Sequence, residues 1–177
     1  MKQWYIILLG LFIAACTQHQ NENAAKPDVS RIQEGPILQA DDATKQFLID
    51  ITNASWYSAK LAYVATLMSH DQNIIKSAQA IRKDYTRIKD KAKIVSIPYH
   101  VEVPYFLTTE QNDSVNMLQN LDSLSFDKKF ISMIRNNNDN IIMRCDNFQK
   151  GIKRSDDLQQ LIDFCRSTVA ANPLSKP

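Results

Sequence analysis

The sequence predicts an all-α protein, and its composition and residue spacing lead to that class. Only 3 of the 177 residues are Gly and 6 are Pro, which is too few turn formers for a many-stranded β sandwich. Hydrophobic residues make up 44% of the chain, enough for one sizeable core. Apolar residues also recur at alternate spacings of three and four, the pattern of an amphipathic helix seam. We therefore expect a single helical domain.

Four long helices are expected in residues 41–172, with residues 173–177 as a frayed tail. Asp41 and Asp42 suit the start of the first helix, and residues 69–71 break the pattern before the second. The seams of these two helices are Phe47, Ile51, Ala54, Ser58, Leu61, Ala65 and Met68, and then Ile74, Ala78, Ile81, Tyr85, Ile88, Ala92 and Val95.

A long crossover separates the two pairs of helices. Residues 96–107 contain two prolines and lack a helical period, and Thr108 is expected to cap a short extra helix. Ser125 is expected to cap the third long helix, Gly151 to end it, and Ser155 to cap the fourth. Their seams are Ile131, Ile134, Asn138, Ile141, Cys145, Phe148 and Ile152, and then Leu158, Ile162, Cys165 and Val169. This order is typical of a ferritin-like four-helix bundle with a long central crossover.

The charge balance and two missing motifs narrow the function. The chain has 21 Lys and Arg against 19 Asp and Glu, a formal net charge of +2, which argues against binding nucleic acid by electrostatic attraction. The sequence contains neither a Gly-rich phosphate loop nor a Gly-x-Ser-x-Gly motif. Nucleotide-binding and hydrolase functions therefore lose support, and we expect no nucleic-acid partner.

Residues 1–15 are predicted to be a lipoprotein signal peptide. Lys2 supplies a short positive segment, and residues 4–15 are apolar but too few to cross a bilayer as a stable helix. The sequence IAAC at residues 13–16 resembles the lipobox of bacterial lipoproteins, in which the cysteine receives a diacylglycerol group. Cys16 is then the acylated first residue of the mature protein. The alternative is an ordinary secretory signal followed by an unmodified Cys16.

Residues 16–40 are expected to be the lipidated cysteine and a flexible tether. They are rich in Gln, Asn, Ala and Pro and have no helical or strand period. About 24 residues of flexible coil span roughly 25–30 Å, enough to hold a domain away from a lipid surface. Thr17 follows the cysteine, and the resemblance to lipoproteins with a residue other than Asp there implies the outer membrane. The domain would then lie in the periplasm or at the cell surface.

Several short motifs lie along the expected bundle, namely Asp41-Asp42-Ala43, Phe47, residues 58–65, Asp84-Tyr85 and the sequence SFDKKF at residues 125–130. Together they resemble the bacterial ferritin-like envelope family called domain of unknown function 4142, over residues 41–170. In the most specific motif, Phe126 and Phe130 are expected to pack inward one turn apart. The resemblance implies a layout similar to di-iron bundles, with a Glu on the first helix and Asp-His pairs on the second and third.

The sequence departs from that family at each implied ligand position. By register, Ser58 stands at the family's Glu, Tyr85 at a His, and Asn137 with Asn138 at an Asp-His pair. Residues 171–177 contain no counterpart of the family's His on the last helix. Ser, Tyr and Asn do not supply the carboxylates and imidazoles that iron or manganese needs in a bundle. We therefore expect neither a metal nor a cofactor.

Three of these residues also stand out without the resemblance, because they interrupt otherwise apolar seams. Ser58, Tyr85 and Asn138 are expected to be buried near the middle of the bundle. There they should hydrogen-bond to one another, to the backbone or to a trapped water. We interpret them as a polar plug that fixes helix register rather than as a ligand or catalytic site.

A metal or oxidant could instead be bound by other side chains. The nearest carboxylates are Asp84, Asp127 and Asp139, but turning them inward requires a helix rotation that exposes the apolar seams. His100 and Glu102 form a second candidate pair in the crossover, although such a loop pair is usually solvated.

The cysteines allow two interpretations. Cys145 and Cys165 both face inward on the last two helices, within roughly 5 Å along the bundle axis at 1.5 Å per residue. An exported domain meets oxidising conditions, so a disulfide worth about 3 kcal/mol is one interpretation. Two buried thiols that pack as small hydrophobic groups are the other.

Two groups of residues outside the helix seams each allow two interpretations. Tyr99, Tyr105 and Phe106 in the crossover either line a ligand cavity or cap the end of the bundle. The outer face of the second helix is basic, and we interpret it as a solvated face rather than a surface for anionic lipid or polysaccharide, because acidic residues interrupt it.

The sequence therefore favours a lipid-anchored protein of the bacterial envelope with a metal-free bundle in a structural or binding role, without enzyme activity. Its expected partners are the membrane, through the anchor, and an unidentified envelope protein or small ligand. The alternative is a metal-binding or redox-active bundle with non-standard ligands.

Overall fold

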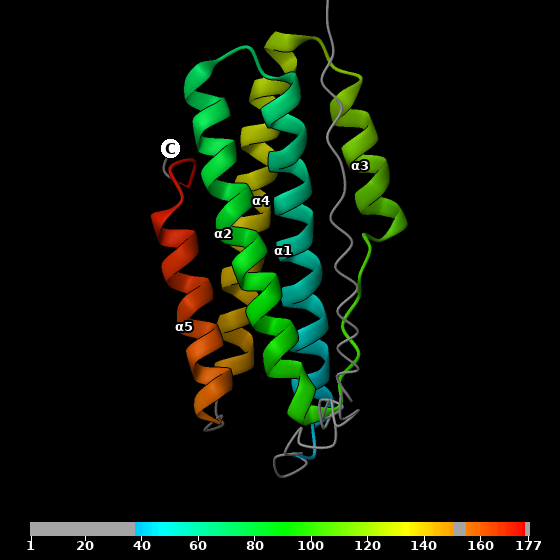
Figure 1. Cartoon of the computed structure of the whole chain (residues 1–177), viewed down its shortest axis with the longest axis vertical. Coiled ribbons are helices and arrows are strands. Elements are labelled where there is room, and N and C mark those ends of the chain that lie inside the picture. The colour runs from blue at the N-terminus through cyan, green and yellow to red at the C-terminus, as the bar shows by residue number, and fades with distance from the viewer. Residues whose placement is uncertain (1–37, 151–154, 176–177) are drawn as a thin grey trace, which may run out of the picture. The chain divides into compact units, whose positions relative to one another are not determined.

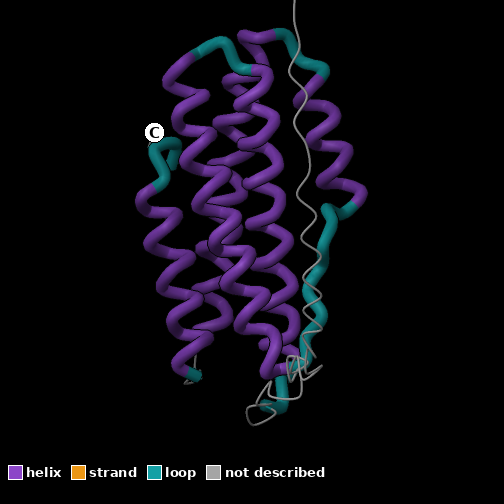
Figure 2. Tube along the Cα trace, viewed as in Figure 1, coloured by secondary structure: helices purple, strands orange, loops and turns teal. Residues whose placement is uncertain are grey.

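The computed structural model describes residues 38–150 and 155–175, which lie in one compact unit. The predicted signal peptide, Cys16, most of the predicted tether and Gly151 fall outside these residues. The described secondary structure is helical throughout, so the predicted all-α class is confirmed (Figure 2). The elements are α1 (Asp42–Met68), α2 (Gln72–Ser96), the 3₁₀ turn η2 (Ile97–Tyr99), α3 (Thr109–Gln119), α4 (Ser123–Gln149) and α5 (Asp156–Ala171).

Side-chain caps set most helix starts as expected. Asp41 accepts a hydrogen bond from the Thr44 amide at 2.7 Å, and Thr108 forms a capping box with Gln111 at the start of α3. Ser155 caps α5. Each cap gives an otherwise unpaired amide of the first turn a partner.

The start of α4 differs from the prediction that Ser125 is its cap. The helix begins at Ser123, and Asp122 is the cap, accepting hydrogen bonds from the amides of Leu124 and Ser125 at 3.1 and 3.0 Å. Hydrogen bonds from the Ser125 backbone and side chain hold the pKa of Asp122 below its ordinary value. A carboxylate also interacts favourably with the positive end of the helix. Because the cap is Asp122 rather than Ser125, the helix begins three residues earlier than predicted.

The long helices form a bundle in which α1 packs against α2 and α4, while α5 packs against the other sides of α2 and α4. The crossover returns the chain toward the end of the bundle at which α2 begins, so α4 runs in the same direction as α2 (Figure 1). The short helix α3 lies outside the four, against α1 and α4. This is the predicted four-helix bundle with a crossover that carries an extra helix.

Apolar side chains from all four long helices fill the core. Phe126 and Phe130 are buried and their rings stack at 6.5 Å, as their spacing predicts. Phe47 of α1 stacks on Phe148 of α4 with ring centroids 4.0 Å apart. Among the predicted seam residues of the first helix, Met68 is the exception, because it is 37% exposed in the last turn. Among the helices in these ranges, none is both long and apolar enough to cross a membrane.

Candidate functional site

The middle of the bundle holds a cluster of buried polar side chains. Ser58 of α1 and Tyr85 of α2 are fully buried, and Asn137 and Asn138 of α4 are 7% and 2% exposed. They stand at four of the positions at which the family resemblance implies metal ligands. Their side chains form two separate hydrogen-bonded groups.

The first group joins α1 to α4. The Asn137 amide nitrogen donates to the Ser58 hydroxyl at 2.7 Å and to the Ala54 carbonyl at 2.8 Å. Both protons of the amide nitrogen therefore have partners, which removes the cost of burying them. Ser58 thus bonds to Asn137, and the structure shows no hydrogen bond from it to Tyr85 or Asn138 among the described residues.

The second group joins α2, α4 and the end of α5. The Tyr85 hydroxyl donates to the Asn138 carbonyl oxygen and accepts a hydrogen bond from the Asn172 amide at 3.4 Å. The Asn138 amide nitrogen donates to the Ser175 hydroxyl at 2.7 Å, and Ser175 donates to the Val169 carbonyl at 2.8 Å. The chain of donors and acceptors therefore ends on the backbone of α5.

Burial raises the pKa of Tyr85 to about 12, and the hydrogen bond from Asn172 opposes this shift. The phenol is therefore neutral across the physiological range. A neutral phenol and neutral amides do not attract a cation strongly, so the cluster lacks the negative charge that iron and manganese sites in bundles use.

The expectation that residues 173–177 fray is wrong for the described residues 173–175. Asn172 ends α5, and its side chain accepts a hydrogen bond from the Leu174 amide at 2.9 Å. The Leu174 carbonyl in turn accepts from the Arg135 side chain at 2.8 Å. Pro173 stops the helix, and the Asx-type turn that follows folds Ser175 back over the polar cluster. The sequence feature that could have predicted this turn is the pair Asn172-Pro173, because Asn-Pro pairs favour turns as well as disordered chain ends.

The three alternative metal ligands do not come together. Asp84 lies 3.7 Å from Arg87 at the protein surface, and Asp139 is exposed. Asp127 and Asp139 are twelve residues apart on α4, which separates them by about 18 Å along the helix. Within the described ranges, the structure contains no group of three His, Cys, Asp or Glu side chains that could hold a metal ion.

Cys145 of α4 and Cys165 of α5 lie side by side in the core. Both are free thiols, and both are buried. The hydrogen bond between them lowers the pKa of Cys145, whereas the same bond and then burial raise the pKa of Cys165 well above its ordinary value. The structure therefore contains two packed thiols rather than a disulfide.

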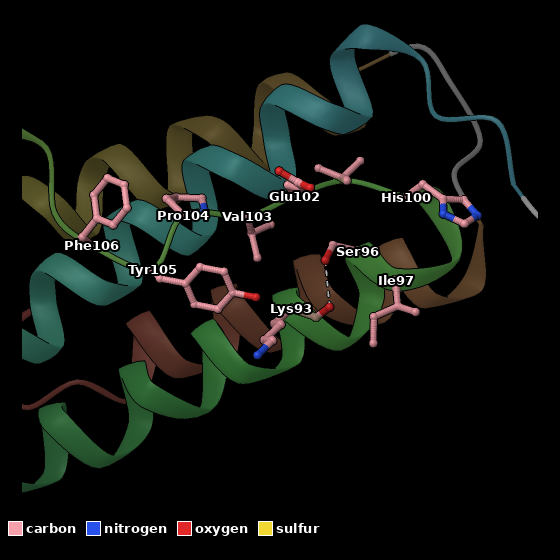
Figure 3. A pocket seen from close by; sticks show the side chains of 10 residues that line it. Lys93, Ser96, Ile97, His100, Glu102, Val103, Pro104, Tyr105 and Phe106 are labelled. Atoms are coloured by element: carbon pink, nitrogen blue, oxygen red, sulfur yellow. Dashed lines mark hydrogen bonds between the residues drawn. The ribbon is translucent and has the colours of Figure 1, made fainter. Parts of the chain in front are cut away.

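The crossover separates the three aromatic residues that the sequence groups together. Tyr99 is buried and its hydroxyl bonds to Ser155 at 2.6 Å, so it fastens the crossover to the start of α5. Tyr105 and Phe106 are 70% and 75% exposed and line a pocket of about 730 Å³. Glu102 and His100 line the same pocket, but their side chains lie apart from each other (Figure 3).

Comparison with known proteins places the chain in a family. A family model described as a domain of unknown function (DUF4142) matches residues 32–172. The chain belongs to the DUF4142 family. The matched region of this DUF4142 domain contains Ser58, Tyr85, Asn137 and Asn138, whereas Ser175 lies three residues beyond it.

The fold of this DUF4142 domain also has a counterpart among solved structures. It is similar to the crystal structure of a DUF305 fragment from Deinococcus radiodurans, with a TM-score of 0.66 and 10% identity over 76% of this chain and 93% of that chain. At this identity the likeness concerns the fold alone. The comparison with curated proteins gives no match.

Proposed function

We propose that this DUF4142 protein is a lipid-anchored protein of the bacterial envelope that acts as a binding module, with its bundle interior serving as a structural plug. The observation that carries this proposal is the closed network around Tyr85 and Asn138. Each side chain in it is neutral and has its partners within the bundle. A network whose donors and acceptors are satisfied in this way stabilises helix register, and interactions with a partner are then made by the outer surface.

The anchoring part of the proposal is supported by the sequence. The motif IAAC at residues 13–16 follows an apolar segment, and the stretch up to residue 40 has the composition of a tether. A cysteine that carries two or three acyl chains binds a membrane firmly, because one chain alone gives only marginal attachment. The bundle would then be held near, but not within, the outer membrane.

Replacing Cys16 with serine is expected to abolish acylation. The full chain is expressed in a lipoprotein-processing bacterium fed with labelled palmitate, and label in the purified protein is measured. The wild-type chain should carry label and sediment with the outer membrane, whereas Cys16→Ser should carry none, because serine lacks the thiol that receives the diacylglycerol.

Cys145→Ala is the matched control, since it removes a cysteine of the bundle and should keep the label. A wild-type chain without label, or a Cys16→Ser chain with as much label as the wild type, contradicts the anchor.

A further inference from the structure

The outer side of the α1–α2 pair carries a row of adjoining depressions. The crossover pocket, which is the pocket of about 730 Å³ lined by Tyr105 and Phe106, shares Lys93 and Tyr105 with a depression of about 120 Å³. That depression shares Trp56 with a third one of about 360 Å³. The latter shares Arg82 and Thr86 with one of about 560 Å³. Four neighbouring depressions thus form one track, defined by these five shared residues, which we call the α1/α2 groove.

The α1/α2 groove is long enough for an extended ligand. It follows α2 from Gln79 to Lys93, about 21 Å at 1.5 Å per residue. The residues of α1 form the opposite wall, and the crossover forms the far end, where Tyr105 and Lys93 face each other (Figure 3). An extended polymer fits this shape better than a compact small molecule.

Positive charge is concentrated along the groove. Its depressions are lined by six basic side chains but only two acidic ones, Asp90 and Glu102. That excess is larger than the net charge of +2 of the whole chain. The basic side chains are Lys60, Arg82, Lys83, Arg87, Lys89 and Lys93. The groove is therefore complementary to an anionic ligand.

Aromatic rings hold the cations in place. The distance from the cationic group to the ring centroid is 4.4 Å for Lys89 over Trp56, 4.7 Å for Arg82 over Tyr63 and 5.0 Å for Lys93 over Tyr105. Such contacts are attractive at this range. A long side chain that is already ordered loses less conformational entropy when it binds an anion.

Several of these cations have no carboxylate partner. Lys89 pairs with Asp90 at 3.2 Å, but in the described part of the chain Lys60, Arg82 and Lys93 form no ion pair. They are available for anions of a ligand. Arg82 and Lys89 are seven residues apart, and Lys89 and Lys93 four, which spaces the charges by about 10 Å and about 6 Å along α2.

The groove also offers hydrogen-bond acceptors. The hydroxyl of Thr86 donates its proton to the Arg82 carbonyl at 2.8 Å, and that of Thr66 donates to the Tyr63 carbonyl at 2.7 Å. Their oxygen lone pairs remain for donors of a ligand. A ligand that carries both hydroxyl groups and negative charges matches this combination.

We propose that the α1/α2 groove binds an extended anionic polysaccharide. The choice of an envelope glycan rests on the proposed location, whereas the groove itself is independent of it. Single-stranded nucleic acid fits less well, because its bases need free aromatic faces and here cations lie over the rings. A bilayer fits less well because its surface is broad and flat, whereas the groove is concave.

The test uses the full chain purified in detergent and polygalacturonate as the anionic probe. The double variant Arg82→Gln with Lys93→Gln is expected to bind it about tenfold more weakly, because both side chains are exposed and two exposed charge contacts are together worth about that factor. Lys128→Gln with Lys129→Gln removes the same charge from exposed positions of α4 and should bind like the wild type. Circular dichroism checks that all three chains are equally helical.

The proposal is overturned by no binding of polygalacturonate, by equal binding of its neutral methyl ester, or by equal losses in the two double variants. Preferential binding to oligothymidine, or to vesicles containing phosphatidylglycerol, also overturns it in favour of nucleic acid or lipid. These results leave the acylation of Cys16 untouched, so a failure here is distinct from a failure of the proposed anchor.

Discussion

Replacing Asn138 with alanine is expected to lower the free energy of unfolding by about 3 kcal/mol. The substitution leaves the buried Tyr85 hydroxyl without its acceptor and the Ser175 hydroxyl without its donor. It also leaves a small cavity between α4 and the end of α5. Urea unfolding of the detergent-solubilised full chain, followed by circular dichroism, measures the change.

Two variants test whether the loss comes from the network. Asn136→Ala changes an exposed residue of the same helix and should alter stability by no more than about 0.5 kcal/mol. The double variant Tyr85→Phe with Asn138→Leu removes both partners, so its cost should be well below the sum of the two single substitutions. A cost of Asn138→Ala as small as that of Asn136→Ala contradicts a stabilising network.

The stability of the wild-type bundle should fall by about 2–3 kcal/mol between pH 10 and pH 12 because of Tyr85 alone. The pKa of this phenol is about 12 in the folded protein against 10.0 for an ordinary tyrosine. The folded state therefore prefers the neutral phenol. Its contribution is complete below pH 10 and is lost as the pH rises through 12.

Other groups also titrate in that range, so the informative quantity is the difference between variants. Tyr85→Phe should lose less stability than the wild type over this interval, because its unfolded state gains no ionised phenol at that position. Tyr105→Phe removes a tyrosine that is 70% exposed and should follow the wild-type curve. Equal slopes for wild type and Tyr85→Phe would show that residue 85 does not titrate abnormally.

The helices and their inward faces were predictable, because a helix seam depends on local spacing alone. The period of three and four residues placed Ile134, Ile141 and Phe148 in the core, where the structure has them. Cap residues located the starts of α1, α3 and α5. The start of α4 was misplaced because Asp122 and Ser125 are both good caps and only the fold decides between them.

The polar pairing was predictable in part. A single seam through α4 selects Asn138, which faces Tyr85 on α2. Asn137 is its neighbour in sequence and points about 100° around the helix, toward Ser58 on α1. Because α4 packs against helices on two sides, both asparagines are buried. One seam per helix therefore identifies Ser58, Tyr85 and Asn138, but it leaves out Asn137 and does not predict which side chains form hydrogen bonds with each other.

Contacts between segments far apart in the chain could not be predicted from the sequence. The return of Ser175 over the polar cluster depends on a turn at Pro173 and on the position of Arg135, 39 residues earlier than the Leu174 carbonyl that it binds. The α1/α2 groove combines outward residues of α1 and α2 with Tyr105 of the crossover. On α2 alone, its cations look like an ordinary solvated face.

The metal content of the protein tests most directly the claim that the bundle interior is a hydrogen-bonded plug. The full chain is purified in detergent without chelators, incubated with ferrous iron and manganese, separated from free ions, and measured by elemental analysis. We predict no stoichiometric metal in a cooperatively folded helical protein, because the central side chains are neutral and bonded to one another. One metal ion per chain, lost on replacing Tyr85 or Asn138, would contradict the account.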